Sequence, residues 1–310
     1  MAVIITGATS FIGIALVERI SYSGERVYAV IRPKSKRKID VSCFKNVAVV
    51  ESELQDLDKV KIDEKCDVLY HIGWSSDFEN PRFNLSGQLK NVEYAEKAAI
   101  LAHNAGCSAF VTVGSQAECG RISGCITSYT PAKPETAYAI AKVVLDEKVR
   151  TLCESFGIKF CAPRLLSGYG PFDRPGTMIM SCIAAGIQGL PFESTPAEQI
   201  WDYIYVDDIA DALVKIASKG VHGKKYPIGS GVARSVKSYI KMIADITNNE
   251  ELLAGVGKRP YADGQVMNLL ADITELTADT GFVPQMSIRN GLINTIEWSR
   301  ARIVVEVGET

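Results

Sequence analysis

The sequence predicts an α/β protein with a doubly wound parallel sheet of the Rossmann type and a smaller C-terminal lobe. Three observations predict this class. Short apolar runs alternate with helical patterns from the N-terminus to about residue 165. A glycine turn joins the first apolar run to the first helical pattern. Beyond residue 165 the alternation loosens, and a chain of 310 residues is long enough for two unequal lobes.

The first strand and its turn predict an anion site. Residues 2–6 form a continuous apolar run, as expected for a strand that is covered on both faces. The turn Gly7-Ala-Thr-Ser-Phe-Ile-Gly13 follows, and apolar residues recur at helical spacing from Phe11. Free amide groups and the helix dipole at such a turn favour a phosphate. A purely structural turn is the alternative, but the flanking strand and helix favour the anion site.

Further apolar runs complete the predicted main sheet, at 26–31, 47–51, 67–71, 109–113 and 158–162. Helices are expected at about 84–104 and 136–155, and a strand and helix from Tyr203 are expected to return to the main sheet. The sequence therefore predicts a dinucleotide-binding domain at 1–165, joined by 201–221. The remaining residues, 166–200 and 222–310, are expected to form a substrate-binding lobe.

Two strand ends carry candidate cofactor contacts. Arg32 follows the second strand, whose tip faces the adenosine ribose in a dinucleotide fold, where a cation tolerates a 2′-phosphate. It therefore favours NADP(H) over NAD(H), whereas the basic stretch 34–38 is interpreted as a solvated loop. Gly73 follows the fourth strand, and a glycine there lets a cofactor approach the backbone closely.

Candidate catalytic groups lie after the fifth strand and in the helix that follows. Ser115 comes at a strand end, and ligands of open α/β sheets bind at the carboxyl ends of strands. Tyr138 and Lys142 are four residues apart, so they are neighbours on one helix face. A lysine held under a tyrosine stabilises the phenolate, which makes the tyrosine a general acid or base. On spacing alone, an inward-packed tyrosine with a solvated lysine is the commoner arrangement.

The composition argues against several classes of protein. With 34 Lys and Arg against 36 Asp and Glu, no net field favours nucleic acid or an anionic membrane. The eight cysteines form no CxxC pair, so we expect small buried side chains in a reducing compartment. Three scattered histidines give no zinc pattern, and we expect no metal. Without a leader pattern or a run of about 20 apolar residues, a cytoplasmic protein is expected.

The motifs together resemble those of a known family. In chain order they are the turn from Thr6 to Gly13, Ser115, Tyr138-xxx-Lys142, Arg164-xxxxx-Gly170-Pro171 and Tyr205-Val-Asp207-Asp. This set resembles the extended short-chain dehydrogenase/reductases, and among them the NAD-dependent epimerase/dehydratase group that modifies nucleotide sugars. The resemblance covers nearly the whole chain. It favours a catalytic over a structural interpretation of the tyrosine and lysine.

The resemblance implies a role for each matching residue. Tyr138 would be the acid or base, Lys142 would bind the nicotinamide ribose and lower the pKa of the tyrosine, and Ser115 would hold the reacting oxygen. The implied cofactor-binding residues are Gly7, Thr9, Ser10, Phe11, Ile12, Gly13, Arg32, Glu53, Leu54, Ile72, Gly73, Trp74, Tyr138, Lys142 and Pro163. The candidate substrate-binding residues are Ser115, Gln116, Arg174, Thr177, Arg234 and Arg259.

Two departures from the family pattern concern the cofactor turn and the reaction class. Ser10 replaces the middle glycine of the turn, so its side chain must fit beside the pyrophosphate, which its hydroxyl could also bind. Gln116 and Ala117 stand where the dehydratases of the family have an Asp-Glu pair. Without that acid and base, elimination of water is not expected.

A third departure concerns the substrate. Trp201 and Ala262 stand where family members that bind a nucleotide diphosphate commonly have arginines. Arg174, Arg234 and Arg259 are candidate replacement cations, although each alone is more typical of an exposed arginine. The nucleotide part of the substrate is therefore less certain than the reaction class.

The expected function is hydride transfer to or from a sugar carbon with NAD(P), as a nucleotide-sugar 4-ketoreductase or 4-epimerase and not as a dehydratase. Arg32 favours reduction with NADPH. The alternatives are a catalytically silent NADP-binding regulator and a reductase of a non-nucleotide carbonyl substrate. The resemblance also implies a homodimer through the helices near 84–104 and 136–155.

Overall fold

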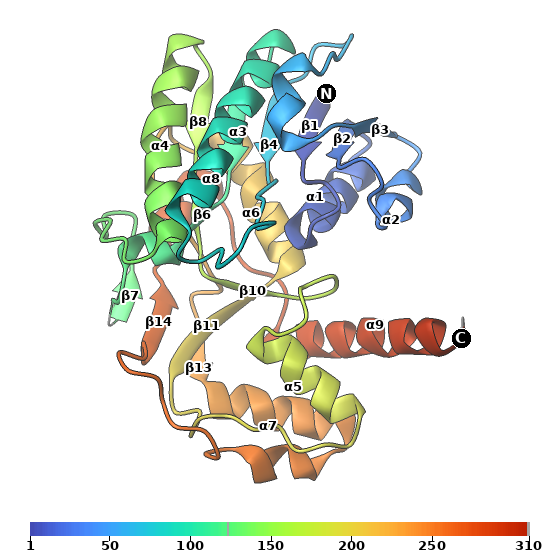
Figure 1. Cartoon of the computed structure of the whole chain (residues 1–310), viewed down its shortest axis with the longest axis vertical. Helices are drawn as coiled ribbons and strands as arrows, with labels where there is room; N and C mark the ends of the chain where they lie inside the picture. Colours follow the sequence, from blue (N-terminus) through green and yellow to red (C-terminus); the bar gives the residue numbers. More distant parts are fainter. Residues whose placement is uncertain (123, 309–310) are drawn as a thin grey trace.

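The computed structural model describes residues 1–122 and 124–308, so residues 309 and 310 of the predicted substrate lobe lie outside the described part. The chain forms an upper lobe around a parallel sheet and a lower lobe of helices and shorter strands (Figure 1). The main sheet has six parallel strands, in the order β3 (Val47–Glu51), β2 (Arg26–Ile31), β1 (Ala2–Thr6), β4 (Val68–His71), β5 (Ala109–Thr112) and β8 (Lys159–Cys161).

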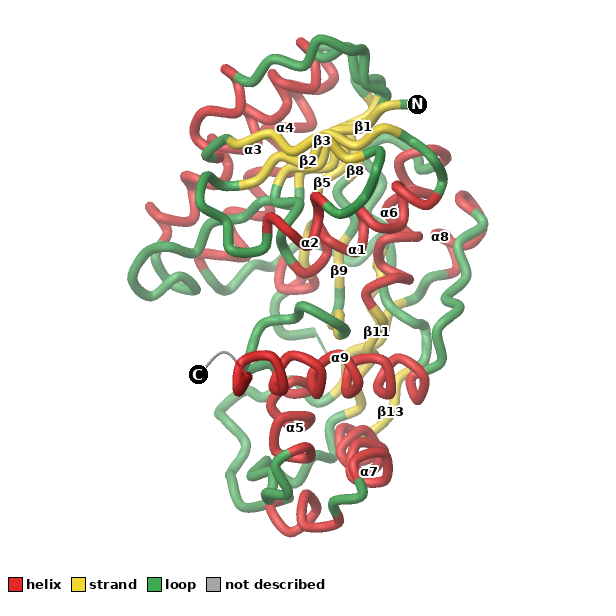
Figure 2. Tube along the Cα trace, turned by 90° about the vertical axis from the view of Figure 1, so that its right-hand side faces the viewer, coloured by secondary structure: helices red, strands yellow, loops and turns green. Residues whose placement is uncertain are grey.

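Helices cover both faces of this sheet (Figure 2). One face carries α3 (Leu85–Asn104) and α4 (Ala137–Ser155), and the other carries α1 (Phe11–Tyr22), α2 (Lys38–Ser42) and α6 (Val206–Lys219). All five residues of β1 are buried, which explains why this strand is a continuous apolar run. The predicted Rossmann-type parallel sheet is confirmed, and β1, β2 and β3 have the predicted bounds.

The lower lobe contains a second sheet and most of the C-terminal helices. Its parallel strands are β10 (Ser167–Tyr169), β11 (Ile200–Tyr205), β14 (Asn268–Ala271) and β7 (Gly124–Ile126), and β13 (Ala233–Ser235) joins β11 antiparallel. A third sheet of three short strands, β12 (Pro227–Ile228), β9 (Arg164–Leu165) and β6 (Gly114–Ser115), lies between the two. The helices that complete the fold are α5 (Met178–Ile187), α7 (Val236–Thr247), α8 (Thr274–Thr280) and α9 (Ile288–Gly308).

Two sequence predictions were wrong. The strand at 200–205 does not return to the main sheet but belongs to the second one, while α6 packs against α1 and β5. The reason is the fully buried Asp202, whose carboxylate accepts hydrogen bonds from the amides of Ser230 at 2.8 Å and Ala271 at 3.2 Å. The cysteines are all free, but Cys43 and Cys125 are exposed, because they lie after a short surface helix and in an edge strand.

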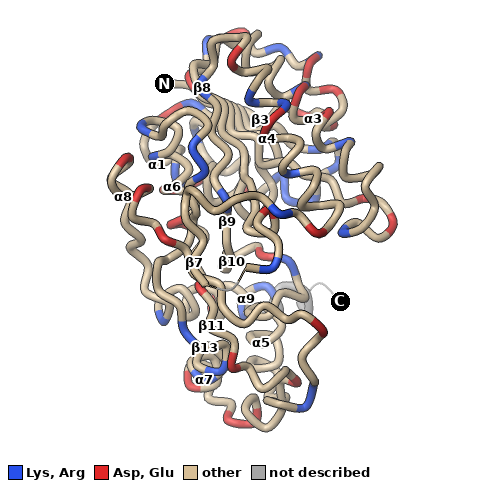
Figure 3. The backbone as a smooth tube through the Cα atoms, turned by 90° about the vertical axis from the view of Figure 1, so that its left-hand side faces the viewer, with Lys and Arg blue, Asp and Glu red and all other residues tan. Residues whose placement is uncertain are grey.

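Along the backbone, Lys and Arg positions alternate with Asp and Glu positions in both lobes (Figure 3), and the formal net charge is −2. Among the described residues, none of the helices has the length and apolar character that crossing a membrane requires.

Replacing Gly7 tests the close packing of the first turn. Gly7 has φ +67°, and a Cβ there would lie 2.6 Å from the backbone of Gly73. Gly24 has φ +83° but open space around a Cβ. We expect Gly24→Ala to cost about 1–2 kcal/mol of unfolding free energy through backbone strain alone. Gly7→Ala should cost about 1–3 kcal/mol more because of the added clash. Equal losses in urea denaturation would contradict this account of the turn.

Candidate active site

A cavity of about 1000 Å³ opens along the carboxyl ends of β1, β2 and β4. Its lining includes residues that follow these strands, as expected for a ligand site of an open α/β sheet. The predicted cofactor and substrate residues in this lining are Gly7, Thr9, Ser10, Arg32, Glu53, Leu54, Gly73, Trp74 and Arg174. The other predicted cofactor residues are not among those that line the cavity, and these are Phe11, Ile12, Gly13, Ile72, Tyr138, Lys142 and Pro163.

The turn between β1 and α1 has no room for a side chain at Gly13. A Cβ on Gly13 would lie 2.2 Å from the carbonyl oxygen of Gly7, so the turn leaves room only for backbone. Ser10 fits because its side chain turns toward the helix, where Oγ accepts a hydrogen bond from the Gly13 amide at 3.1 Å. The first-turn amides of Phe11 and Ile12 have no acceptor within the helix. This cradle fits the pyrophosphate of a dinucleotide.

The end of the cavity near β2 includes more of the basic stretch after Arg32 than the sequence indicated. Arg32 is exposed and pairs with Asp77 at 3.0 Å. In the predicted solvated loop, Ser35 and Arg37 are partly buried and line the cavity. Ser35 Oγ lies 3.3 Å from Thr9 Oγ1, and Arg37 Nη1 donates to the Thr9 carbonyl at 3.5 Å. In the sequence, the position of Ser35 and Arg37 in the loop after Arg32 was the feature that could have indicated their place in the cavity.

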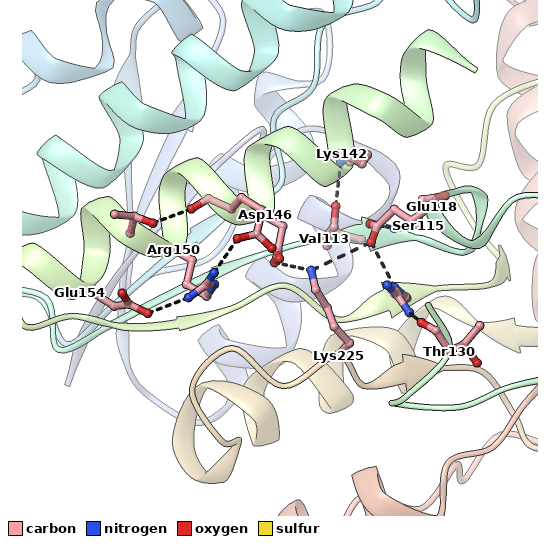
Figure 4. Close-up of polar contacts among 12 residues, drawn as sticks. Val113, Ser115, Glu118, Thr130, Lys142, Asp146, Arg150, Glu154 and Lys225 are labelled. Atoms are coloured by element: carbon pink, nitrogen blue, oxygen red, sulfur yellow. Dashed lines mark hydrogen bonds and ion pairs between the residues drawn. The ribbon is translucent and has the colours of Figure 1, made fainter. Parts of the chain in front are cut away.

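The helix α4 brings Tyr138 and Lys142 to the end of β5. Thr136 begins this helix by accepting a hydrogen bond from the Ala139 amide at 3.2 Å. Lys142 is buried, and its Nζ donates to the carbonyl of Val113 at 2.7 Å (Figure 4). The same ammonium lies 3.6 Å from the ring centroid of Trp74, a cation–π contact, and 5.8 Å from that of Tyr138.

The pKa values of the pair differ from the simple expectation. Burial lowers the pKa of Lys142 to about 7. Burial also raises the pKa of Tyr138, and the nearby Ser115 hydroxyl and Arg174 guanidinium only partly oppose this. Burial is the largest influence on the Tyr138 pKa, and the expectation that Lys142 lowers this pKa stays a prediction. A phenol with a raised pKa is protonated at neutral pH and is a proton donor.

Ser115 lies beside the Tyr138 phenol at the end of β6. It begins a short 3₁₀ turn, Gln116–Cys119, and its Oγ accepts a hydrogen bond from the Ala117 amide at 3.2 Å. Pro163 supports this strand from behind, since its carbonyl accepts a hydrogen bond from the Gly114 amide at 2.8 Å. The structure thus brings the three predicted catalytic side chains together.

The predicted substrate arginines do not converge. A second cavity of about 670 Å³ lies in the lower lobe, and of the three only Arg259 lines it, pairing at 3.4 Å with the exposed Glu193. Arg174 lines the upper cavity, and Arg234 is exposed on β13 opposite Trp201. Trp201 lines the lower cavity, and its indole Nε1 donates to Ser167 Oγ at 2.7 Å.

The remaining predicted substrate residues line neither cavity, although the two neighbours of Thr177 in the chain line the lower one. Thr177 begins α5, and its hydroxyl donates to the buried Asp173 at 2.9 Å. Gln116 is partly buried in the turn after Ser115. Gln199 was not predicted, although it lines the lower cavity and is largely buried.

A parallel sheet with a backbone cradle after β1 and a Tyr–Lys pair beyond β5 defines an extended short-chain dehydrogenase/reductase. The chain belongs to the NAD dependent epimerase/dehydratase family, a model of which matches residues 3–229. The predicted family is thus confirmed.

Curated relatives and solved structures agree with this membership. The chain is 33% identical over 186 residues to a dTDP-glucose 4,6-dehydratase of Escherichia coli, which covers 56% of this chain and 49% of the relative. The chain thus spans about half the length of the curated relatives it matches. A UDP-glucose 4-epimerase of Thermotoga maritima has a TM-score of 0.82 at 19% identity, covering 98% of this chain and 100% of that one. MoeE5 in complex with UDP-glucose and NAD has a TM-score of 0.83 at 24% identity, with 98% and 100% covered. At these identities the structures establish the fold alone.

Replacing Lys142 by methionine tests the cost of the buried ammonium. A lysine whose pKa falls from 10.5 to about 7 on folding destabilises the folded state below pH 7, and this cost disappears as pH rises toward 10.5. We therefore expect Lys142→Met to be more stable than the wild type by about 1–3 kcal/mol at pH 6. The difference should shrink between pH 7 and 10 in urea denaturation. A variant that is less stable at pH 6 would show that the Val113 and Trp74 contacts outweigh desolvation.

Proposed function

We propose that this protein is an NAD(P)-dependent oxidoreductase that acts on a sugar carbon, as a nucleotide-sugar 4-ketoreductase or 4-epimerase. The observation that carries the proposal is the grouping of Ser115, Tyr138 and Lys142, of which Tyr138 and Lys142 contact Trp74 in the lining of the upper cavity. Family membership supports the class of reaction. The main-sheet part of the chain would hold the cofactor, and the lower lobe would hold the substrate.

The chain's own groups account for the proton transfer. The nicotinamide, when bound, supplies the hydride to the carbonyl carbon. Ser115 and Tyr138 would hold the carbonyl oxygen, and the protonated phenol of Tyr138 would donate its proton to it. The ammonium of Lys142 would favour the phenolate that remains and hold the ribose hydroxyls of the cofactor. Reduction would begin with the protonated phenol, which is the form that Tyr138 has at neutral pH because burial raises its pKa.

Dehydration is not part of the proposal, although the curated relatives named above are dehydratases. Elimination of water needs an acid and a base near the sugar, and Gln116 and Ala117 offer neither. Glu118 is the carboxylate that follows them, but it is 1% exposed and already pairs with Arg164 at 3.1 Å. It is therefore not available to a substrate.

A preference for NADP(H) follows from the adenosine end of the cavity. Arg32, Lys34, Lys36 and Arg37 line it together with Ser35. Cations and a hydroxyl at this place would stabilise a 2′-phosphate. MoeE5, which is similar in fold, is described with NAD, so the proposed preference rests on the residues of this chain alone.

A non-nucleotide carbonyl compound is the second candidate substrate. Trp201 and Ala262 replace the expected arginines, and the one cation among the residues that line the lower cavity, Arg259, is paired with Glu193. A neutral substrate would suit this cavity better than a diphosphate. The predicted homodimer through α3 and α4 stays a prediction.

Replacing Tyr138 by phenylalanine tests the proposed mechanism. The variant keeps the ring that packs at 5.6 Å against Trp74 but loses the proton donor. We expect turnover of 4-keto-sugars with NADPH to fall by at least about 10²-fold, while NADPH affinity changes little. Rates should be followed by NADPH absorbance and affinity by calorimetry. A variant that keeps most of its activity would rule out Tyr138 as the proton donor.

Replacing the arginines of the adenosine end tests the cofactor preference. Arg32→Ala and Arg37→Ala should each weaken NADPH binding by about tenfold and leave NADH binding nearly unchanged, because only NADPH has the 2′-phosphate. Arg150→Ala, on the outer face of α4, is the matched control and should change neither. Titrations of both cofactors, repeated with UDP, CDP, GDP and dTDP present, also test for a nucleotide site. Tighter binding of NADH than NADPH by the wild type would contradict the preference.

A further inference from the structure

A buried carboxylate lies directly behind the candidate catalytic serine. Glu118 is 1% exposed, and each of its oxygens has its own partner. Oε1 accepts a hydrogen bond from the Ser115 amide at 2.8 Å, and Oε2 accepts one from Arg164 Nε at 3.1 Å. We propose that Glu118 is a positioning residue, which fixes Ser115 against Tyr138 through a buried ion network. This inference rests on the function proposed above.

The contact between Glu118 and Ser115 is reciprocal. The Ser115 side chain caps the 3₁₀ turn that contains Glu118, and the Glu118 side chain returns to the Ser115 amide, so the two form a capping box. Gly114 leaves room for this arrangement, because a Cβ there would lie 2.6 Å from Glu118 Oε1. The backbone on both sides of the serine is thus fitted to the carboxylate.

The network joins three further parts of the fold (Figure 4). Arg164 on β9 also donates to the Thr130 carbonyl at 2.5 Å. Lys225, just before β12, lies 4.0 Å from Glu118 and pairs with Asp146 on α4. Asp146 follows Lys142 by four residues on the same helix, so the network holds the helix that carries Tyr138 as well as the turn that carries Ser115. Two cations and two carboxylates balance one another.

The charge of Glu118 acts on the proton-transfer groups as well. It raises the pKa of Lys142 and the pKa of Tyr138, so it favours the charged lysine and the protonated phenol. The other charged or polar groups that face the Tyr138 and Lys142 pair are Ser115, Arg174, the neutral His71 and the ring of Trp74. Around Glu118 itself the facing groups are Arg164, Lys225, Asp146 and the Cys119 thiol.

Two substitutions separate the geometry of Glu118 from its charge. A carboxamide has one acceptor oxygen where a carboxylate has two, so Glu118→Gln must leave one donor unpaired. The charged Arg164 loses more than a neutral amide when it is unpaired, so the oxygen should stay with Arg164 and the Ser115 amide should lose its acceptor. Glu118→Asp keeps the charge but is one methylene too short to reach both partners. Glu154→Gln is the matched control, an exposed carboxylate on α4 that pairs with Arg150 at 3.0 Å.

Hydrogen exchange of the Ser115 amide measures how firmly Glu118 holds the serine, and the measurement does not depend on enzymatic activity. In Glu118→Gln the Ser115 amide should exchange at least about tenfold faster than in the wild type, while amides of β1 and β4 keep their rates. Glu154→Gln should leave the Ser115 rate unchanged. If Glu118→Gln fails to fold, the same measurement on Glu118→Asp decides the question. An unchanged Ser115 rate in the folded variant would overturn the proposal.

Steady-state kinetics with NADPH and a keto-sugar that the wild type reduces measure how the Glu118 substitutions affect the reaction. We expect kcat to fall about ten- to a hundredfold in both Glu118 variants, with NADPH affinity unchanged. Only Glu118→Gln should move the alkaline limb of the pH–rate profile to lower pH. Of the two variants, only this one removes the charge that raises the pKa of Tyr138. If neither variant shifts the pH–rate profile, the proposed effect of the Glu118 charge on Tyr138 is overturned. If the Ser115 amide exchanges faster in Glu118→Gln but the wild-type protein shows no turnover, the anchoring is supported and the proposed function is refuted.

Discussion

The burial of one ammonium group organises the candidate active site. Removing a lysine side chain from water is costly unless its charge finds partners. Lys142 finds them in the carbonyl of Val113, which extends β5, and in the ring of Trp74, which follows β4. Trp74 is held in turn by Gln88 of α3, whose side-chain oxygen accepts from the indole at 2.9 Å. These contacts fix α4 against two strand ends and thereby fix Tyr138.

The three short strands between the lobes have a second organising role. They connect the end of the main sheet to the lower sheet, and Ser115 lies on one of them. Glu118 and Arg164 form an ion pair within this layer, and both are almost completely buried. A buried pair of this kind gives little net stability, but breaking it is costly, so it selects one arrangement of the chain. The candidate catalytic serine is thus placed by contacts within this layer.

The sequence was informative where one local pattern decides the structure. The strands β1 to β3 had the predicted bounds, because burial on both faces makes each a continuous apolar run. The helix α4 was also predicted, since Thr136 is a good N-cap and the residues after it favour a helix. The strand-end rule placed Ser115 near Tyr138 without any knowledge of the sheet order.

The errors concern features that depend on distant residues. Strand 200–205 joins the second sheet because Asp202 meets amides of residues 230 and 271, which no local pattern reveals. Ser35 and Arg37 line the cavity because the chain folds back onto Thr9. Burial raises the pKa of Tyr138, and burial is set by the whole fold. Glu118 shows no sequence signal beyond a short capping motif.

The most direct test of the proposed function follows the hydrogen that is transferred. The protein should be incubated with a panel of nucleotide-linked and free keto-sugars and with NADPH that carries deuterium on C4 of the nicotinamide. Mass spectrometry of the products then shows where the deuterium goes. A 4-ketoreductase gives an alcohol with one deuterium at the former carbonyl carbon and an equal amount of NADP⁺. Loss of the ketone without deuterium in the product, or no reaction with any ketone of the panel, would contradict the reductase activity.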